Sequence, residues 1–411
     1  MQQHLFNQDC KEVSNEDKNG KILEDLFRAY FSARVNKRKK TASMQFELNF
    51  ESNILELYDE IIQRKYVLSP STCFITNKPV KREIFAADFR DRIIHHFLYN
   101  YLSPIYENQF ISDSYSCREG KGVHYGIKRI DHFIRSCSEN YKKDCYILKL
   151  DISGYFMNIR RDLLFLMIKK ELEKRKDKVD FDFSLVIYLL DKIINSDPTK
   201  GCIVRGNKED WQGLPKTKSL FYSKNNCGLP IGNLTSQLFA NVYLNDFDHF
   251  VKKDLGIRYY GRYVDDMVII HKDKNYLKKV VFEIEKYLED NLCLRLHPKK
   301  RYLQHYSYGV EFLGSIIKKD RIYVSERLKG NFWEAINSAN MEIAKEEKIK
   351  DCQKEKILSQ INSYLGFLSH FQTYNLKKKM IFLFNASAKE VFSFNSEDYK
   401  KIKVLNNSII V

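Results

Sequence analysis

The chain has 411 residues, of which 44% are hydrophobic, and a formal net charge of +16 at pH 7. A chain of this length and hydrophobic content can bury a sizeable core in one large unit or in two to three modules. The positive charge indicates a polyanionic partner. An apolar run of the roughly 20 residues that span a bilayer is absent from the sequence. The N-terminal residues are polar and unlike a secretory signal. The sequence therefore predicts a cytoplasmic protein without a membrane segment.

Cysteine and histidine usage argues against a zinc site. The nine cysteines include no pair at Cys-x-x-Cys spacing, which argues against a zinc ribbon or a zinc-dependent endonuclease. Their scatter fits free thiols in a reducing compartment. His95 and His96 lie in an apolar run, and we expect them to pack in a helix rather than to bind metal.

The first third of the chain reads as mainly helical. Residues 1–45 are polar and carry Lys37-Arg38-Lys39-Lys40 near their end, which predicts a helix and a basic arm. Residues 46–145 predict helices with a basic loop. Further along, residues 160–226 form a long charged excursion.

The middle of the chain holds two segments that end in carboxylates. The apolar string before Asp151 reads as a strand, and the Ser153-Gly154 pair that follows suits a strand exit. Residues 257–271 are β-rich, with Asp265 and Asp266 where a hairpin would turn.

Helical periodicity returns around these strands. Residues 235–251 predict one amphipathic helix, with Asn245, Asp246 and Asp248 on its polar face rather than as metal ligands. From residue 325 to residue 392, helical periodicity again dominates, with many lysines.

Three carboxylates from separate parts of the chain point to a metal site. A buried carboxylate pair is costly without a cation, and a divalent metal removes that cost. Mg²⁺ prefers carboxylate oxygens and leaves room for phosphate and water. A cluster of Asp151, Asp265 and Asp266 could hold two Mg²⁺ ions for phosphoryl transfer. Taken singly, a solvated Asp-Asp turn and a strand-end cap remain alternative interpretations.

The combined strings resemble a known family. Tyr263-Val264-Asp265-Asp266, preceded by Leu150-Asp151-Ile152-Ser153-Gly154-Tyr155-Phe156, is similar to the palm of a reverse transcriptase. The resemblance implies an α+β right-hand polymerase with helical and β fingers, a palm of antiparallel sheet with packed helices, and an α-helical thumb. The implied boundaries are an N-terminal basic extension at 1–45, fingers at 46–145, a palm at 146–318 with the charged insertion at 160–226, and a thumb at 319–411.

The resemblance also implies the catalytic residues. Asp151, Asp265 and Asp266, with the backbone carbonyl of Ile152, would hold two Mg²⁺ ions. Lys300, in the string Leu296-His297-Pro298-Lys299-Lys300, would protonate the pyrophosphate leaving group.

Further positions match nucleotide-binding and strand-binding motifs of the family. Lys81 and Arg82 match the segment that grips the triphosphate, and a basic side chain suits that role, although a solvated basic turn would look the same. Phe156 matches the position that blocks a ribose 2′-OH and implies deoxynucleotides, although an ordinary core Phe is the alternative. The implied template and primer residues are Arg118, Lys121, Tyr263, Phe312, Leu313 and Gly314.

One string narrows the subfamily. Ile231-Gly232-Asn233, followed by Ser236-Gln237, resembles the reverse transcriptases of diversity-generating retroelements, as do residues 214–220 and 363–366. Related enzymes of other groups carry Gln where this chain has Ile231 and Pro where it has Gln237. The resemblance implies error-prone copying opposite template adenines. Ile231 offers the incoming nucleotide only shape, although a core Ile at a helix start is the alternative.

The sequence thus predicts an RNA-directed DNA polymerase. It would use an RNA template, a DNA or RNA primer and deoxynucleoside triphosphates. A small basic accessory oligomer or a cognate noncoding RNA would be a further partner. Three alternatives remain: a bacterial antiphage reverse transcriptase, a group II intron-like maturase, and a nucleotide cyclase with a related palm.

Overall fold

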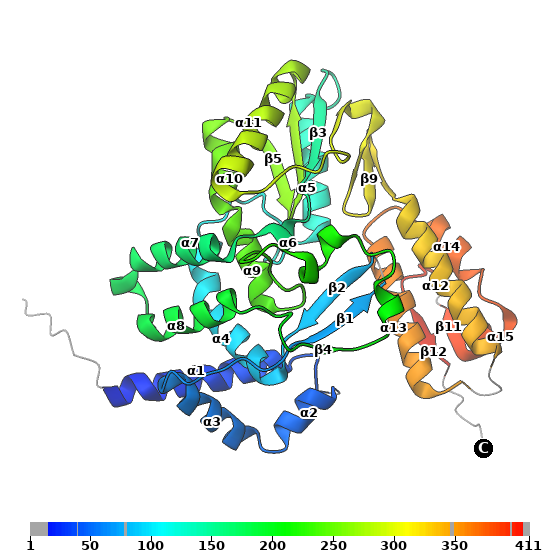
Figure 1. Ribbon diagram of the computed structural model, residues 1–411. Helices are drawn as coiled ribbons and strands as arrows, with labels where there is room; N and C mark the ends of the chain where they lie inside the picture. The colour runs from blue at the N-terminus through cyan, green and yellow to red at the C-terminus, as the bar shows by residue number, and fades with distance from the viewer. Residues whose placement is uncertain (1–14, 39, 78–79, 346–348, 395–396, 406–411) are drawn as a thin grey trace, which may run out of the picture.

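The structure is a computed structural model that describes residues 15–38, 40–77, 80–345, 349–394 and 397–405 (Figure 1). The predicted α+β class is confirmed. The helices are α1 Asn15–Arg34, α2 Thr41–Glu47, α3 Phe50–Ile62, α4 Phe89–Glu107, α5 Val123–Cys137, α6 Tyr155–Asn158, α7 Arg161–Glu173, α8 Phe183–Asn195, α9 Leu234–Tyr243, α10 Asn245–His249, α11 Lys274–Leu292, α12 Glu326–Ala344, α13 Asp351–Leu368, α14 Tyr374–Ile381 and α15 Ala386–Val391. The strands are β1 Thr72–Thr76, β2 Arg82–Ala86, β3 Tyr146–Asp151, β4 Ile203–Val204, β5 Tyr259–Tyr263, β6 Asp266–His271, β7 Tyr302–His305, β8 Val310–Phe312, β9 Ser315–Lys318, β10 Arg321–Val324, β11 Phe392–Phe394 and β12 Ile402–Val404.

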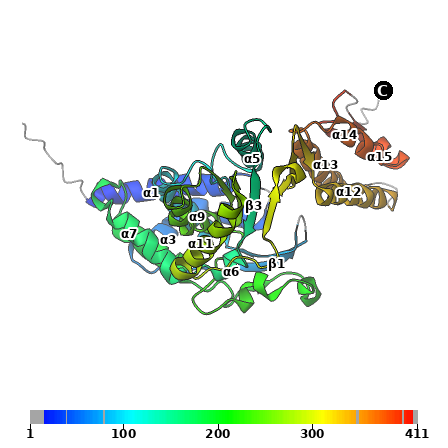
Figure 2. The same cartoon turned by 90° about the horizontal axis from the view of Figure 1, so that it is seen from above.

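A four-stranded antiparallel sheet forms the centre of the molecule, in the order β5-β6-β3-β7. Side chains of the two central strands, β6 and β3, point alternately to two apolar layers, because successive residues of a strand face opposite sides of the sheet. Leu150 and Met267 face the layer that contains α9 and α11, whereas Ile147 and Val268 face the layer of α5. Figure 2 shows α5 on one side of β3 and α11 on the other. Because α5 covers one face of the sheet and α9 and α11 cover the other, we expect a site at the ends of the strands.

The N-terminal helix belongs to the main core. The apolar side of α1, including Leu26 and Tyr30, is buried against α4. The expected helix is therefore present. Of the expected basic arm, Lys39 lies outside the described residues, as do residues 1–14.

The charged excursion begins as a helical hairpin, α7 and α8, that packs on α4 and α9 (Figure 1).

His95 of α4 is buried in the same core, and its Nδ1 lies 2.7 Å from the Thr235 hydroxyl of α9. Burial lowers the pKa of His95 to about 3, so the imidazole is neutral. The prediction of a packed histidine is confirmed.

A second small sheet joins distant segments. β1 pairs antiparallel with β2 and parallel with β4, which comes from the later part of the charged excursion. After β4 the chain runs through short 3-10 turns as far as Tyr222. The excursion therefore packs back on the finger strands instead of projecting away from them.

The C-terminal part contains a second core. Helices α12 to α15 enclose a separate apolar cluster, which also takes in β11 and β12. The expectation of a purely helical thumb is therefore incomplete. Phe392-Ser393-Phe394 and Ile402-Lys403-Val404 alternate apolar and polar residues, and they pair as an antiparallel ribbon.

The predicted single helix at 235–251 is wrong in one respect. α9 ends at Tyr243, Leu244 takes φ −101° and ψ 5°, and α10 starts at Asn245. Neither Gly nor Pro marks this break in the sequence. None of the helices in the described ranges is both long enough and apolar enough to cross a membrane.

Candidate active site

Two aspartates meet across the central sheet. Asp151 is the last residue of β3, and Asp266 is the first residue of β6 and its direct partner in the antiparallel register. Tyr263 pairs with Asp266, so the hairpin turn consists of Val264 and Asp265. The predicted hairpin is confirmed, with Asp266 in the strand rather than in the turn. All three carboxylates therefore lie at one end of one sheet.

The turn carries backbone strain. Val264 has φ +56°, a conformation that is rare for a β-branched residue. Such outliers persist only where surrounding contacts hold them, and they concentrate at functional sites. The strained residue therefore directly precedes Asp265 in the two-residue turn.

The three carboxylates repel one another. Burial, and then the negative charges of Asp151 and Asp266, raise the pKa of Asp265 to about 7. Burial also raises the pKa of Asp266, with a smaller contribution from Asp151. The site therefore carries a surplus of negative charge that favours a cation.

Two lysines partly neutralise this charge. Lys300 Nζ donates to Asp151 Oδ2 at 2.8 Å, and Lys149 Nζ lies 3.6 Å from Asp266 Oδ1. Burial alone would lower the pKa of Lys300, but the hydrogen bond to Asp151 and the neighbouring carboxylates raise it overall. Of the two adjacent lysines at 299 and 300, the predicted one contacts the site. Lys149 was not predicted, although its position two residues before Asp151 in a strand places it on the same face.

In the described parts of the chain, no three His, Cys, Asp or Glu side chains converge as a ready ligand set for a metal ion. The aspartates are neighbours, but the carboxylate of Asp151 pairs with Lys300, and the carboxylate of Asp266 pairs with Lys149. The donor set itself consists of carboxylate oxygens, the ligand type that Mg²⁺ prefers. Ile152, the predicted carbonyl ligand, follows β3 and forms an isolated bridge with Leu296.

A buried ion pair supports the turn from behind. Arg262 and Asp248 are both fully buried, and Arg262 Nη2 lies 2.6 Å from Asp248 Oδ2. Arg262 Nη1 also donates to the carbonyl of Val264 at 2.9 Å. The expectation that Asp248 lies on a polar helix face is therefore wrong, because its carboxylate balances a buried guanidinium. Arg262 was not singled out from the sequence, since a single Arg between Gly261 and Tyr263 gives no signal of its partner.

Phe156 and Ile231, predicted to contact the nucleotide, pack in one apolar cluster. Both pack against the buried cluster that contains Phe85 and Leu220, and both are partly buried. The backbone N–H of Phe85 donates to the carbonyl of Ile231 at 2.9 Å. The structure therefore brings the strand β2, the α6 segment and the Ile231 turn together.

The close approach of the Ile231 turn to strand β2 requires a glycine at position 232. It has φ +131°, and a Cβ there would lie 2.9 Å from Ile84 Cγ2 and 3.1 Å from the Phe85 carbonyl oxygen. Gln237 is exposed on α9, outside the apolar cluster.

The two predicted triphosphate residues have different surroundings. Lys81 Nζ donates to the carbonyl of Gln212 at 2.6 Å, whereas Arg82 is exposed. Burial raises the pKa of the Tyr263 hydroxyl, and the nearby charge of Arg82 opposes that shift. The charge of Arg82 therefore acts on the hairpin that carries the aspartates.

Arg118 does not have the surroundings of a template contact. Its side chain is only 6% exposed, and the guanidinium donates to Glu107 and to the carbonyls of Ile111 and Ser114. These bonds hold its own loop, and the template role of Arg118 stays a prediction. Lys121 is partly exposed, with Nζ 3.1 Å from the Tyr125 hydroxyl and above that ring.

The predicted primer-grip string forms the turn between β8 and β9. Leu313 and Gly314 have φ +51° and +81°, and Phe312 is buried. Positive φ at both central residues is typical of a tight two-residue hairpin. Lys149 Nζ donates to the carbonyl of Glu311 at 3.0 Å, so one lysine contacts both this hairpin and Asp266.

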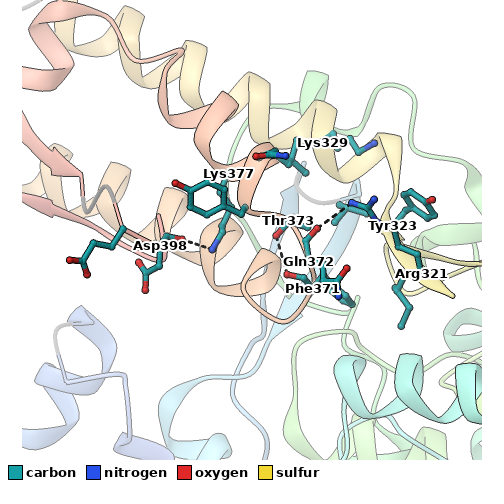
Figure 3. Close-up of a pocket in the computed structure, with 14 residues that line it drawn as sticks. Arg321, Tyr323, Lys329, Phe371, Gln372, Thr373, Lys377 and Asp398 are labelled. Carbon is teal, nitrogen blue, oxygen red and sulfur yellow. Dashed lines mark hydrogen bonds between the residues drawn. The ribbon is translucent and has the colours of Figure 1, made fainter.

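A cavity of about 530 Å³ lies elsewhere, between β10 and α14 (Figure 3). Lys377, buried in its wall, donates to the backbone carbonyl of Asp398 at 2.6 Å. Arg321 and Tyr323 line the opposite side in the view of Figure 3. None of the predicted site residues lines this cavity, so the candidate active site is the open end of the central sheet.

The fold and the site together define a class of protein. An antiparallel palm sheet carries carboxylates at the ends of two adjacent strands, with a finger sheet and a mainly helical thumb beside it. This is the architecture of a right-hand nucleotide polymerase. Residues 77–317 match the family "Reverse transcriptase (RNA-dependent DNA polymerase)". The chain belongs to this family, and by class it is an RNA-directed DNA polymerase.

Individual relatives are distant. Protein YkfC of Escherichia coli (strain K12) is 25% identical over 329 residues, which cover 72% of this chain and 77% of that protein. The group II intron-encoded protein LtrA of Lactococcus lactis subsp. cremoris is 25% identical over 194 residues, 47% of this chain and 26% of LtrA. Nuclear intron maturase 1, mitochondrial, of Arabidopsis thaliana is 21% identical over 59% of this chain and 42% of that protein. Among solved structures, an apo telomerase from Candida tropicalis that lacks its C-terminal domain is similar over 66% of this chain and 59% of the telomerase chain. The TM-score is 0.45 and the sequence identity is 16%.

Proposed function

We propose that this chain copies an RNA template into complementary DNA by joining deoxynucleotides to the 3′ end of a DNA or RNA primer. The observation that carries the proposal is the register of β3 and β6, which sets Asp151 directly opposite Asp266 with Asp265 in the adjoining turn. Such a group of carboxylates has a use in phosphoryl transfer, which depends mainly on positioning and on neutralising charge.

The proposed cofactor is Mg²⁺, two ions per site. The residues fit, because the donors are oxygens and because the raised pKa of Asp265, about 7, reflects burial and unbalanced negative charge. Asp151, Asp265 and Asp266 would hold the metal, with the carbonyl of Ile152. Bound Mg²⁺ supplies charge neutralisation at the reacting phosphate and lowers the pKa of a coordinated hydroxyl.

The chain's own residues account for the remaining steps. The primer 3′-hydroxyl releases its proton to solvent, its oxygen forms a bond to the α-phosphorus, and the bond from that phosphorus to the pyrophosphate oxygen breaks. Lys300, kept protonated by the carboxylates, gives its proton to the departing pyrophosphate. Arg82 and Lys81 hold the triphosphate, and Phe156 excludes a 2′-hydroxyl. The Phe312-Leu313-Gly314 turn positions the primer end.

The subfamily we propose is that of diversity-generating retroelements. In these the product is a mutagenised copy of a template-repeat RNA, with errors opposite adenines, and a small basic oligomeric protein assists. The position of Ile231 in the cluster with Phe156 supports a role beside the nucleotide. An apolar side chain there removes hydrogen-bond readout, which is worth about 1–3 kcal/mol where a mismatch leaves groups unpaired. A bacterial antiphage enzyme with a noncoding RNA partner is the nearest alternative. A variable repeat beside a template repeat in the genome would favour the retroelement.

A second candidate function is intron splicing as a maturase. The similarity to LtrA and to Nuclear intron maturase 1 favours it, although both are matched over less than half of their own length. Splicing of a cognate intron by an Asp266→Ala variant would support an RNA-binding role that is independent of polymerisation.

The test is primer extension on an adenine-containing RNA template with Mg²⁺, followed by sequencing of the product. We expect extension with errors concentrated opposite adenine. Faithful extension would support the polymerase activity and would favour the antiphage enzyme over the retroelement enzyme. Failure to extend, even with native RNA and a partner protein supplied, would contradict the proposed function.

A further inference from the structure

A buried carboxylate in the fingers connects two distant segments. Glu83 of β2 is 1% exposed and accepts three hydrogen bonds. The donors are Trp211 Nε1 at 2.8 Å, Ser219 Oγ at 2.8 Å and the backbone N–H of Leu220 at 2.7 Å. All three belong to the segment 208–222, which follows Glu83 by more than 120 residues. One side chain thus anchors the irregular part of the charged excursion, which we call the 208–222 loop.

The anchored 208–222 loop lies against the residues assigned to the nucleotide. Leu220 and Trp211 belong to the same apolar cluster as Phe156 and Ile231. On its other side the loop contacts the turn that follows Asp151. A Cβ at Gly154 would lie 2.7 Å from the carbonyl oxygen of Thr217, and Gly154 has φ +54°. The loop therefore packs on Gly154 and on the apolar cluster of Phe156, two points of the short segment that follows Asp151.

The basic residues lie at the start of the same strand: Arg82 is its first residue, and Lys81 directly precedes it. Glu83 and Phe85 point to the apolar cluster, whereas Arg82, one residue away, points to the opposite side and is exposed. Lys81 Nζ donates to the carbonyl of Gln212, so it contacts the loop as well. Because the Phe85 N–H also holds the Ile231 carbonyl, strand β2 connects the loop, the basic pair and the Ile231 turn.

We propose that Glu83 is a positioning residue for the deoxynucleotide: it fixes the 208–222 loop as a wall of the nucleotide pocket behind Phe156. This inference rests on the proposed function. Without the carboxylate, the three donors lose their shared acceptor, and buried donors without a partner are costly. The loop then moves to hydrate them, which releases the packing on Phe156. A looser Phe156 holds the deoxynucleotide less well and excludes a 2′-hydroxyl less strictly.

Glu83→Gln is the principal test variant, because it preserves shape while one acceptor oxygen becomes an NH₂ group that faces donors. We expect KM for the deoxynucleotide to rise about tenfold, which corresponds to about 1.4 kcal/mol, with kcat within about twofold. We expect the preference for deoxynucleotides over ribonucleotides to fall by about the same factor. Trp211→Phe removes a single N–H and keeps an aromatic ring, so it should shift KM and selectivity in the same direction by about threefold.

Asp91→Asn is the matched control. Asp91 is also 1% exposed, and it accepts hydrogen bonds from the Tyr66 hydroxyl and the Ser69 N–H. Neither donor belongs to the apolar cluster of Phe85 and Leu220. This variant should leave KM and selectivity unchanged.

The measurements are steady-state incorporation of a deoxynucleotide and of the matching ribonucleotide on one primer and RNA template. Unchanged KM and selectivity in Glu83→Gln, with only stability or kcat altered, would overturn the inference. If Glu83→Gln does not fold, the same criterion applies to Trp211→Phe. A wild-type chain that extends no primer refutes the proposed function first, and this inference with it.

Discussion

Arg262 and Asp248 form an ion pair in which neither side chain reaches solvent, directly behind the turn that carries Asp265. The guanidinium also donates to the carbonyl of Val264, the residue whose φ is +56°. The ion pair and the strained turn are therefore parts of one arrangement. The turn that carries Asp265 is thus held by a contact that lies outside the catalytic group.

Removing the cation of this pair should destabilise the protein strongly. In Arg262→Met the Asp248 carboxylate stays buried without a partner, and breaking such a pair costs about 3–5 kcal/mol. Denaturant unfolding measures the loss. Arg295→Met is the control, because the ion pair of Arg295 with Glu289 is 80% and 59% exposed, and an exposed pair is worth about 1 kcal/mol or less. Equal losses in the two variants would contradict the role of Arg262.

Asp265→Asn should abolish primer extension and leave RNA binding nearly intact, because binding depends on the basic surface. The same variant should melt at a higher temperature than the wild type at pH 8 without Mg²⁺. The folded pKa of Asp265, about 7, lies above the unfolded value near 4, so stability falls as the pH rises between these values, and the full loss is present at pH 8. The amide removes that charge. Joint loss of RNA binding and activity would indicate a structural role for Asp265.

Lys300→Met should slow nucleotide addition by about 10²-fold, the usual contribution of a general acid. Lys299→Met is the matched control: Lys299 is exposed, and it is Lys300 whose Nζ lies 2.8 Å from Asp151. Single-turnover extension separates this step from primer binding. Equal rates in the two variants would exclude Lys300 as the proton donor.

Local patterns in the sequence were sufficient to predict the centre of the site. The apolar string before Asp151 and the β-rich residues 257–271 around Asp265 predict two strands. Because both strands belong to one sheet, their ends bring the carboxylates together. Apolar runs and turn residues indicate, to within a few positions, where such strands begin and end.

Contacts between distant segments were not predictable in the same way. Glu83 with Trp211, and Arg262 with Asp248, join positions whose pairing no local pattern encodes. The partners of Arg118 were likewise not predictable. Its motif predicts a template contact, but in the structure its guanidinium bonds Glu107 and two carbonyls, and these contacts depend on how its own loop folds.

Asp91 should make folding stability depend on pH in the mildly acidic range. Burial raises its pKa to about 6 in the folded state, above the unfolded value near 4. The folded state therefore binds more protons between these values, and stability falls as the pH rises from 4 to 6. The full effect is about 3 kcal/mol, from two pKa units at 1.36 kcal/mol each. The unfolding free energy of the wild type minus that of Asp91→Asn should fall across this range, and a constant difference would contradict the prediction.

Replacing Ile231 by Gln should make copying more faithful opposite template adenine. The amide would add hydrogen-bonding groups beside Phe156, in the cluster where Ile231 now offers only apolar contact. A mismatch would then leave buried polar groups unpaired, at about 1–3 kcal/mol, which corresponds to roughly a fivefold to hundredfold fall in error frequency. Ile231→Val is the control, because it keeps an apolar, β-branched side chain and should leave the error spectrum unchanged. Sequencing of cDNA made on one adenine-containing template measures all three proteins. An Ile231→Gln spectrum identical to that of the wild type would show that the side chain at this position does not read the nucleotide.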